Sequence, residues 1–270
     1  MPDFIRFENV AKQYSSKHGN VDVLSDVRFS VEPGQFISIL GASGCGKSTL
    51  LMMAAGLEQI SSGRIMVAGQ AVSAPRRDVG IIFQDATLLP WKSAIENVLF
   101  PIEVFRLSAA KYQPRAEALL QMVGLGEAMH KRPRELSGGM RQRVAICRAL
   151  IHEPTLLLMD EPFSALDAIT RDDLNIALLE MWGRHHQTAL FVTHSIREAV
   201  FLSDRVIVLG GRPGRVLADI EIPFERPRVF SVGDTAEFNS ICAELRARIA
   251  TGHLAAARSV AAISRSKVDA

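Results

Sequence analysis

Residues 36 to 48 read Phe36-Ile37-Ser38-Ile39-Leu40-Gly41-Ala42-Ser43-Gly44-Cys45-Gly46-Lys47-Ser48. The apolar first part is typical of a buried strand, and the second part matches the pattern G-x-x-x-x-G-K-[ST] of phosphate-binding loops. The glycines let backbone N–H groups turn inward around phosphate oxygens, and the helix expected after the loop adds its positive end. In such a loop Lys47 would neutralise the β- and γ-phosphates, and Ser48 would coordinate Mg²⁺. The stretch therefore predicts a nucleotide site on a strand–loop–helix unit.

On both sides of this unit, predicted strands alternate with predicted helices. We expect strands at 5–10, 27–31, 64–67, 79–83, 156–159, 188–193 and 205–209, and helices at 50–57, 172–182 and 196–202. Strands that alternate with helices imply a largely parallel sheet.

Two regions depart from this alternation. Residues from about 93 to 150 show helical periodicity and predict a mostly helical insertion. After Ile222, the spacing of Phe238, Ile241, Leu245 and Ile249 predicts one amphipathic helix, and the small and polar residues from about Ala255 are typical of a disordered tail. We therefore expect one domain over residues 1–222 and a short extension over 223–270.

Composition limits the classes of function. The net charge of +2 is too small to argue for nucleic acid as a partner. Three widely spaced cysteines favour a reducing compartment over a disulfide framework or a zinc cluster. The N-terminus lacks the apolar segment of a signal peptide, and no apolar run approaches the roughly 20 residues of a membrane helix. If the protein works at a membrane, we expect another chain to span it.

A second candidate anion site reads Leu136-Ser137-Gly138-Gly139-Met140-Arg141-Gln142-Arg143. A serine followed by two glycines at a helix start can offer a hydroxyl and backbone N–H groups to an anion. Taken alone, the same residues could be an ordinary helix cap. The segment closely resembles the signature motif of ABC ATPases, although Met140 stands where the common form has glutamine.

A third group of residues ends a predicted strand, Leu156-Leu157-Leu158-Met159-Asp160-Glu161. It resembles the Walker B motif with its catalytic glutamate, whereas alone it could be any strand that ends in acids. The resemblance implies that Asp160 holds Mg²⁺ through water and that Glu161 polarises the attacking water as general base. Ser164-Ala165-Leu166-Asp167 follows at the place of the family's D-loop.

Three further residues fit the same family. Phe83-Gln84 resembles the Q-loop, in which Gln84 would contact Mg²⁺ or the attacking water. Val192-Thr193-His194 resembles the H-loop, in which a neutral His194 would lie near the γ-phosphate. Tyr14 stands where the family places an aromatic ring under adenine, although an ordinary strand aromatic is the other interpretation.

The order of these motifs resembles the ABC ATPase family from about Phe4 to Ile222. The resemblance implies an α/β fold: a P-loop NTPase core with a mostly parallel sheet, an antiparallel β subdomain and a helical subdomain. It also implies that two copies pair head to tail, with ATP between the phosphate loop of one and the signature motif of the other. The implied catalytic residues are Glu161, His194 and Gln84, and the implied Mg²⁺ ligands are Ser48, Gln84 and Asp160. The implied ATP-binding residues are Tyr14, Gly41, Ala42, Ser43, Gly44, Cys45, Gly46, Lys47, Ser48, Thr49, Ser137, Gly138 and Gly139.

Finer features look like the nitrate/sulfonate/taurine branch of bacterial importers. The first is Leu88-Leu89-Pro90-Trp91 after the Q-loop, with Ile95-Glu96-Asn97-Val98 behind it, and the second is Phe163 after the acidic pair. The third is Gly211-Arg212-Pro213-Gly214-Arg215-Val216, which precedes a final strand and Arg226-Pro227-Arg228. This branch implies an ATPase at the cytoplasmic face of the cell membrane, a separate permease and, indirectly, a solute-binding protein. The first of these segments could also be a proline turn with an anchored tryptophan.

Other ABC proteins work outside transport. The chain lacks the long coiled-coil insertion of DNA-repair members and the doubled core of translation members. The length of the chain also fits an ATPase of iron–sulfur assembly, so this alternative is not excluded by size. Glu161 weighs against a regulatory module that binds nucleotide without turnover.

Overall fold

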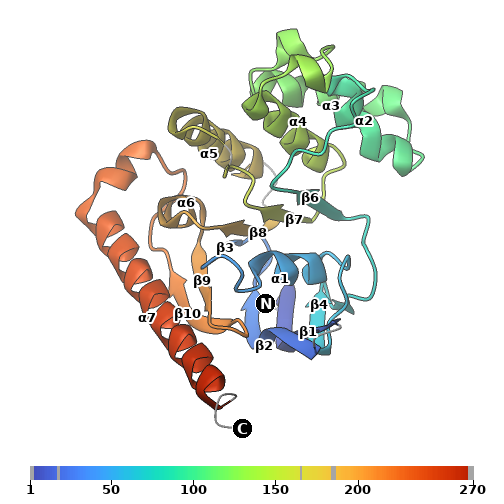
Figure 1. Ribbon diagram of the computed structural model, residues 1–270. Coiled ribbons are helices and arrows are strands. Elements are labelled where there is room, and N and C mark those ends of the chain that lie inside the picture. The colour runs from blue at the N-terminus through green and yellow to red at the C-terminus, as the bar shows by residue number, and fades with distance from the viewer. Residues whose placement is uncertain (1–2, 17–18, 165, 184–186, 267–270) are drawn as a thin grey trace. The chain divides into compact units, whose positions relative to one another are not determined.

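The computed structural model describes residues 3–16, 19–164, 166–183 and 187–266, with residues 252–266 described by their backbone alone. Two compact units make up the chain (Figure 1). The first unit joins residues 1–75 to residues 190–270, and the second unit is residues 76–189.

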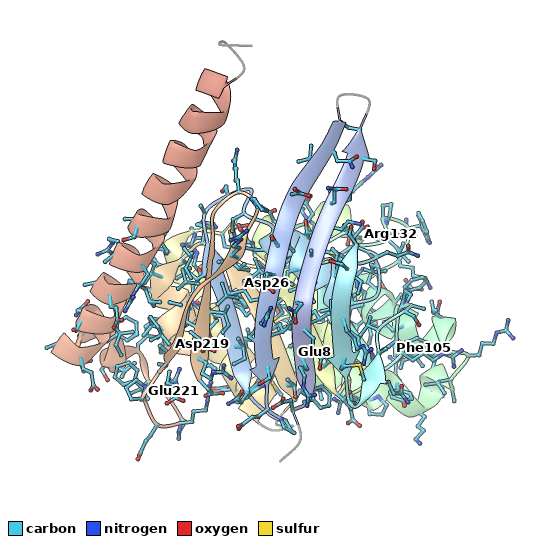
Figure 2. All side chains as sticks on the ribbon, turned by 90° about the horizontal axis from the view of Figure 1, so that it is seen from below. Glu8, Asp26, Phe105, Arg132, Asp219 and Glu221 are labelled. Carbon is cyan, nitrogen blue, oxygen red and sulfur yellow. The ribbon has the colours of Figure 1, made fainter. Side chains whose placement is uncertain are left out.

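An antiparallel sheet forms one part of the first unit. Its strand order is β2 (Gly19–Val31), β1 (Ile5–Ser16), β4 (Ser62–Val67) and β5 (Gln70–Ala71). The two long strands form a hairpin that pairs from Ile5↔Val31 to Ser16↔Gly19, which is far beyond the expected strands at 5–10 and 27–31 (Figure 2). Register shifts between Phe7 and Gln13 interrupt the alternation of apolar and polar residues. Since strand prediction depends on that alternation, the outer half of the hairpin is not visible in the sequence.

The phosphate-loop stretch lies in the other sheet of the first unit. The neighbouring strands there are β10 (Arg215–Glu221), β9 (Arg205–Gly210), β3 (Phe36–Gly41) and β8 (Thr188–Thr193), whose first two residues belong to the second unit. The strand β3 runs parallel to β9 and is buried along its whole length. Burial on both faces explains why its sequence is apolar apart from Ser38, whose hydroxyl hydrogen-bonds with that of Ser203. The helices α1 (Lys47–Ala54) and α6 (Ile196–Leu202) follow β3 and β8.

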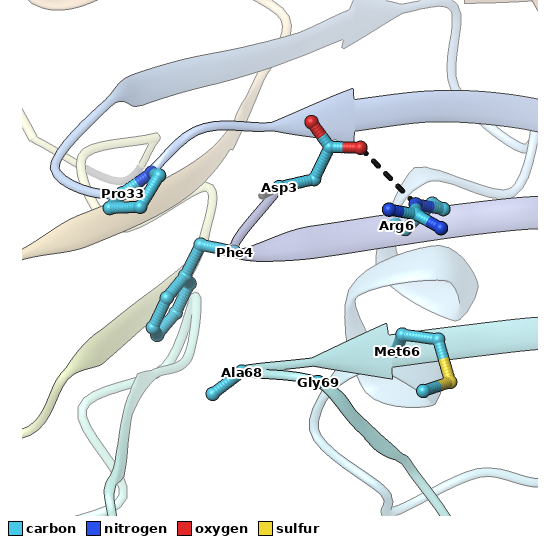
Figure 3. Close-up of a pocket in the computed structure, with 7 residues that line it drawn as sticks. All are labelled: Asp3, Phe4, Arg6, Pro33, Met66, Ala68 and Gly69. Atoms are coloured by element: carbon cyan, nitrogen blue, oxygen red, sulfur yellow. Dashed lines mark hydrogen bonds and ion pairs between the residues drawn. The ribbon is translucent and has the colours of Figure 1, made fainter. Parts of the chain in front are cut away.

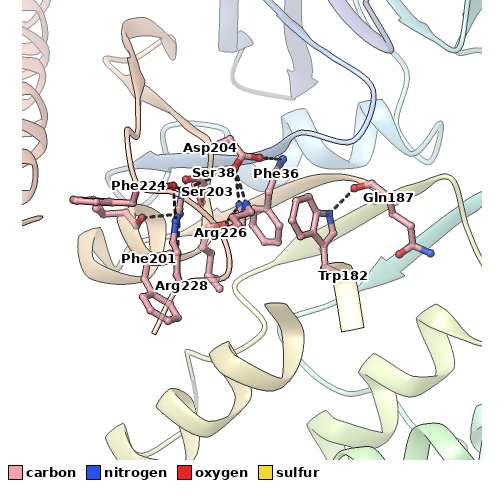
Figure 4. A network of polar contacts seen from close by, with 12 residues as sticks. Phe36, Ser38, Trp182, Gln187, Phe201, Ser203, Asp204, Phe224, Arg226 and Arg228 are labelled. Carbon is pink, nitrogen blue, oxygen red and sulfur yellow. Dashed lines mark hydrogen bonds and ion pairs between the residues drawn. The ribbon is translucent and has the colours of Figure 1, made fainter. Parts of the chain in front are cut away.

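The C-terminal segment packs on the first unit through two arginines (Figure 4). Arg228 is buried and donates to the carbonyls of Val200, Phe201 and Ser203 at the end of α6. Arg226 donates to the carboxylate of Asp204. After these contacts, the chain continues into η3 (Phe230–Asp234) and α7 (Ala236–Ser266).

The expected amphipathic helix is present as α7. Its residues Phe238, Cys242 and Leu245 are buried at helical spacing. The helix continues to Ser266, so residues 255–266 are helical where composition favoured a disordered tail.

The second unit combines two strands with a group of helices. The strands β6 (Val79–Ile82) and β7 (Leu156–Asp160) pair in parallel. The helices are α2 (Ala94–Val104), α3 (Ala109–Met122), η1 (Gly126–Ala128), η2 (Pro133–Glu135), α4 (Gly138–Leu150) and α5 (Ala168–Gly183). Helical structure thus dominates residues 93–150, as the periodicity predicts. Across the described parts of the chain, no helix combines the length and apolarity needed to cross a membrane.

Candidate functional site

The phosphate loop leaves β3 through glycines at positions that disfavour a side chain. A Cβ atom on Gly41 would lie 2.2 Å from the carbonyl oxygen of Leu209 on β9. Gly44 and Gly46 have φ angles of 77° and 97°, in the region that glycine adopts without steric cost. The loop conformation therefore follows from its glycines and from the neighbouring strand.

A buried cation lies inside this loop. The side chain of Lys47 is 5% exposed, and its Nζ donates to the carbonyl oxygens of Gly41 (3.0 Å) and Ala42 (3.1 Å). The helix α1 begins at Lys47, and its N-cap residue is Gly46, which has no side chain to cap the first N–H groups. Ser43, Gly44 and Ser48 are exposed at the rim. A positive helix end beside an ammonium group and exposed hydroxyls is suited to a polyphosphate.

Cys45 contributes packing rather than thiolate chemistry. Burial raises the pKa of its thiol, and the nearby Lys47 opposes this only in part. Its Sγ lies 3.7 Å from the carbonyl oxygen of Leu209. The thiol therefore stays protonated near neutral pH and fills space under the loop.

His194 follows β8 directly and is exposed. The residues around it are held by a short chain of hydrogen bonds: Ser195 N donates to Thr193 Oγ1 (2.9 Å), and that hydroxyl donates to Glu198 Oε2 (2.7 Å). Ser195 in turn caps α6 by accepting from Glu198 N. This chain of bonds fixes the backbone on both sides of His194.

In the second unit, β7 ends in the two predicted acids. Leu156, Leu157, Leu158 and Met159 are completely buried, and Asp160 and Glu161 are partly exposed at the end of the strand. Glu161 has a φ of 44°, which is rare for a residue with a side chain. The N–H and Oγ of Ser164 both donate to the carbonyl oxygen of Glu161 (3.2 and 3.0 Å). The turn that follows therefore fixes the backbone of Glu161 in this conformation.

The segment at the D-loop position leads into α5. Ala165 lies outside the described residues, whereas Asp167 accepts hydrogen bonds from the N–H and Oγ1 of Thr170 (3.0 and 2.7 Å). These bonds, with the backbone bond the larger cause, lower the pKa of Asp167. Asp167 thus stabilises the first turn of α5 as a carboxylate.

The signature segment forms the predicted helix start. Ser137 is the N-cap of α4 and its Oγ accepts from Met140 N (3.3 Å), while Ser137 and Gly138 are exposed. A Cβ on Gly139 would lie 3.0 Å from Cγ2 of Thr170, so this glycine lets α4 approach α5 closely. The signature segment and the D-loop segment therefore lie side by side.

Gln84 follows β6 and is exposed. Two residues of α4, which the sequence did not single out, hold the backbone around it. Gln142 Nε2 donates to the Phe83 carbonyl (3.2 Å), and Arg148 donates to the carbonyls of Ala86 (2.8 Å) and Thr87 (3.0 Å). Nothing in the sequence spacing indicates these contacts, because they join residues about 60 positions apart.

Asn97 organises the turn after this segment, a role that the sequence did not predict although Asn97 belongs to one of the quoted family features. Its buried side chain accepts from Leu89 N (2.7 Å) and donates to the carbonyls of Leu89, Lys92 and Ser93. Trp91, between these residues, is 67% exposed. The turn is thus anchored by the asparagine and not by the tryptophan. The available signal was a second polar residue, next to Glu96, in a stretch that is otherwise apolar from Ala94 to Leu99.

The predicted site residues thus fall into two groups. Tyr14, the loop Gly41–Thr49 and His194 belong to the first unit; Gln84, Ser137–Gly139, Asp160 and Glu161 belong to the second. A pocket of about 350 Å³ lies in the first unit. Figure 3 shows the residues that line it. The pocket contains none of the predicted residues, since it is lined by Asp3, Phe4, Arg6, Pro33, Met66, Ala68 and Gly69.

Comparisons with known proteins agree with the motifs. A sequence model described as ABC transporter matches residues 24–164. The chain is 45% identical over 228 residues to a nitrate import ATP-binding protein of Synechococcus elongatus, covering 83% of each chain. It is 43% identical over 248 residues to a taurine import ATP-binding protein of Rhizobium johnstonii, covering 91% of this chain and 94% of the relative. A bicarbonate transport ATP-binding protein of Synechocystis is 43% identical, covering 83% of this chain and 81% of the relative.

A solved structure extends the agreement to the fold. A dimeric ATP-binding cassette in a post-hydrolysis state, bound to ADP and Pi, superposes with a TM-score of 0.73 at 31% identity, covering 82% of this chain and all of that one. The predicted fold class and the predicted likeness to the nitrate/sulfonate/taurine branch are confirmed. The chain therefore belongs to the ABC transporter family, as an ATP-binding cassette whose reaction is ATP hydrolysis coupled to transport.

Proposed function

We propose that this chain powers the import of a small oxyanion, such as nitrate, a sulfonate or taurine, through a separate permease. The observation that carries the proposal is the phosphate loop, in which Lys47 is buried against the carbonyls of Gly41 and Ala42 at the start of α1. The oxyanion class comes from the nitrate and taurine import proteins to which the chain is similar over 83% or more of its length.

Each predicted site residue has a role in this proposal. The loop Gly41–Thr49 binds the phosphates, and Tyr14 stacks on adenine. Ser48, Gln84 and Asp160 hold Mg²⁺ together with phosphate oxygens and water, which is the oxygen-rich set that this ion prefers. Glu161 accepts a proton from the attacking water, and His194 and Gln84 orient that water and the γ-phosphate.

A second copy of the chain completes the site. Ser137, Gly138 and Gly139 of one copy contact the γ-phosphate held by the other. Two observations support this arrangement: Ser137 and Gly138 are exposed at a helix start, and the similar solved cassette is a dimer.

The permease docks at Leu88–Trp91. Asn97 orders this turn and leaves Trp91 exposed, which is unusual for a residue that only fills a core. The turn follows Gln84 directly, so a movement of the permease reaches a residue assigned to Mg²⁺ and the attacking water. The chain then works at the cytoplasmic face of the membrane, and a solute-binding protein delivers the oxyanion on the other side. The relatives named above are all transport proteins, which weighs against a role in iron–sulfur assembly.

The test is uptake by the assembled transporter. The chain is used to isolate the permease and the solute-binding protein that assemble with it. Uptake of nitrate, taurine and bicarbonate into proteoliposomes that contain this complex is then measured with ATP inside. We expect uptake of one of these solutes, its loss with Glu161→Gln, and uncoupled ATPase activity with Trp91→Ala. Failure to form a complex with any permease, with ATPase activity intact, would contradict the proposal.

A further inference from the structure

The ring of Tyr14 rests on a buried lysine. Lys12 and Tyr14 lie on the same face of β1, and Lys12 Nζ is 4.5 Å from the centroid of the Tyr14 ring. This distance is within the range in which a cation is attracted to an aromatic face. Lys12 is only 8% exposed, whereas Tyr14 is 39% exposed. One face of the ring is therefore covered by a cation, and a substantial part of the side chain remains open.

Lys12 is fixed by the segment after α1. Its Nζ donates to Glu58 Oε1 (2.6 Å) and to the carbonyl oxygen of Gln59 (2.8 Å). A buried ammonium needs such partners, because an unpaired charge in the interior is very costly. The hydrogen bond from Lys12 lowers the pKa of Glu58, with a smaller contribution in the same direction from the Tyr14 side chain. The three side chains thus form one cluster that links β1 to the segment after the phosphate-loop helix.

The same face of the hairpin contacts the phosphate loop. Leu24 lies opposite Lys12 in the strand register, so the two side chains share a face. A Cβ on Gly46 would lie 2.6 Å from Cδ2 of Leu24, which places this side chain directly against the loop. Tyr14 follows two residues after Lys12 on that face, opposite Val21. The exposed ring and the phosphate loop are therefore connected through a single packed surface.

We propose that Lys12 and Glu58 are positioning residues for the nucleotide base: they hold the Tyr14 ring so that its open face stacks on adenine. The inference rests on the proposed function, which places ATP in the phosphate loop with Tyr14 under the base. The cation withdraws electron density from the ring, which favours stacking on the electron-rich purine, and the ion pair keeps the ring from turning away.

The experiment compares two ligands that share phosphates and differ in the base. Binding of Mg-ATP and of Mg-tripolyphosphate to the full chain is measured by titration calorimetry. We expect Lys12→Met, which keeps the apolar stem and removes the charge, to weaken ATP binding about three- to tenfold with little change for tripolyphosphate. Tyr14→Ala should weaken ATP binding about tenfold or more, also without affecting tripolyphosphate. In ATPase assays Lys12→Met should raise KM more than it lowers kcat.

Two variants separate positioning from folding. Lys12→Arg keeps a cation at the ring and should restore most of the ATP affinity. Glu58→Gln removes the charge that anchors Lys12 and should weaken ATP binding less than Lys12→Met. The matched control is Gln13→Met, at the residue next to Lys12 in β1. It removes the hydrogen bond that Gln13 Nε2 donates to Asp22 Oδ1 on β2 (2.7 Å), and it should leave the binding of both ligands unaffected.

The outcomes distinguish the two proposals. If Lys12→Met weakens ATP and tripolyphosphate equally, or leaves both unchanged while Tyr14→Ala weakens ATP alone, then Lys12 does not position the base and the inference is wrong. If Lys47→Ala leaves the binding of both ligands intact, the phosphate-loop assignment itself fails.

Discussion

The phosphate loop of the first unit and the signature segment of the second both place glycines at a helix start, yet they are built differently. The helix α1 has glycine as its N-cap, and Lys47 lies buried in the loop. The helix α4 is capped by Ser137, whose Oγ accepts from Met140 N, and its first residues are exposed. The first N–H groups of α1 thus have no side-chain cap and lie beside a buried ammonium group, whereas α4 carries its own serine cap.

This difference indicates that the two segments have different roles in binding a phosphate ligand. A loop with its own buried ammonium group can bind a polyphosphate within one chain. At the start of α4, the nearest cation is Arg141, and its guanidinium donates to the carbonyl of Leu136 (2.7 Å). We therefore expect this capped start to offer weaker donors and to need a ligand that something else holds. We therefore expect mutations in the phosphate loop to abolish binding, and mutations in the signature segment to affect pairing of two copies.

The largest effect is expected for Lys47→Ala. Removing the ammonium group leaves the γ-phosphate without its main counter-charge, so ATP binding should fall strongly and hydrolysis should stop. Nucleotide titration and a phosphate-release assay measure the two effects. If ATP affinity and hydrolysis rate are unchanged in this variant, the phosphate loop does not differ from the signature segment in the way proposed here.

Glu161→Gln should separate binding from turnover. The amide keeps the size of the side chain but cannot accept a proton, so hydrolysis should slow at least about a hundredfold while Mg-ATP binding stays normal. Single-turnover kinetics with radiolabelled ATP give the rate. Normal turnover in this variant would show that a residue other than Glu161 is the general base.

A mixing experiment tests whether the two helix starts meet across two chains. In a Glu161→Gln background, Lys47→Ala prevents ATP binding and Ser137→Glu places a negative charge against the γ-phosphate. Each variant alone should stay monomeric with ATP, whereas their mixture contains one intact site per heterodimer. Size-exclusion chromatography should then show an ATP-dependent dimer.

The control for mixing is the Glu161→Gln chain combined with each variant, which shows whether one intact site holds a dimer. If these control mixtures dimerise and the mixture of the two variants does not, the phosphate loop and the signature segment do not share one ATP across two chains.

The smallest effect is expected for Ser137→Ala. Loss of the hydroxyl that accepts from Met140 N should cost about 1 kcal/mol of stability, as for other helix caps. In a chain of this size, such a loss lowers the melting temperature by about 2–4 °C. Calorimetry without nucleotide measures it, and ATP affinity of the monomer should not change. A large loss of monomer affinity would show that Ser137 acts within its own chain.

Whether a feature can be predicted from the sequence depends on how far apart its contacting residues lie along the chain. The phosphate loop, the cap at Ser137 and the buried strand before Asp160 could be predicted, because each depends on residues within a few positions of one another. Lys12 could not be recognised as buried, because its partners Glu58 and Gln59 are more than 45 positions away. The same holds for Gln142 and Arg148, which contact a loop about 60 positions earlier.

Local sequence patterns are sufficient to predict the phosphate loop, the order of the motifs and the alternation of strands and helices. These depend on glycine conformation, apolar periodicity and capping, which are local properties of the chain. The tertiary structure decided the length of the β1–β2 hairpin, the unusual backbone of Glu161 and the cluster of Lys12, Glu58 and Tyr14. It decided them because pairing between strands, the turn that fixes a strained residue and the burial of a charge all require partners that only folding brings together.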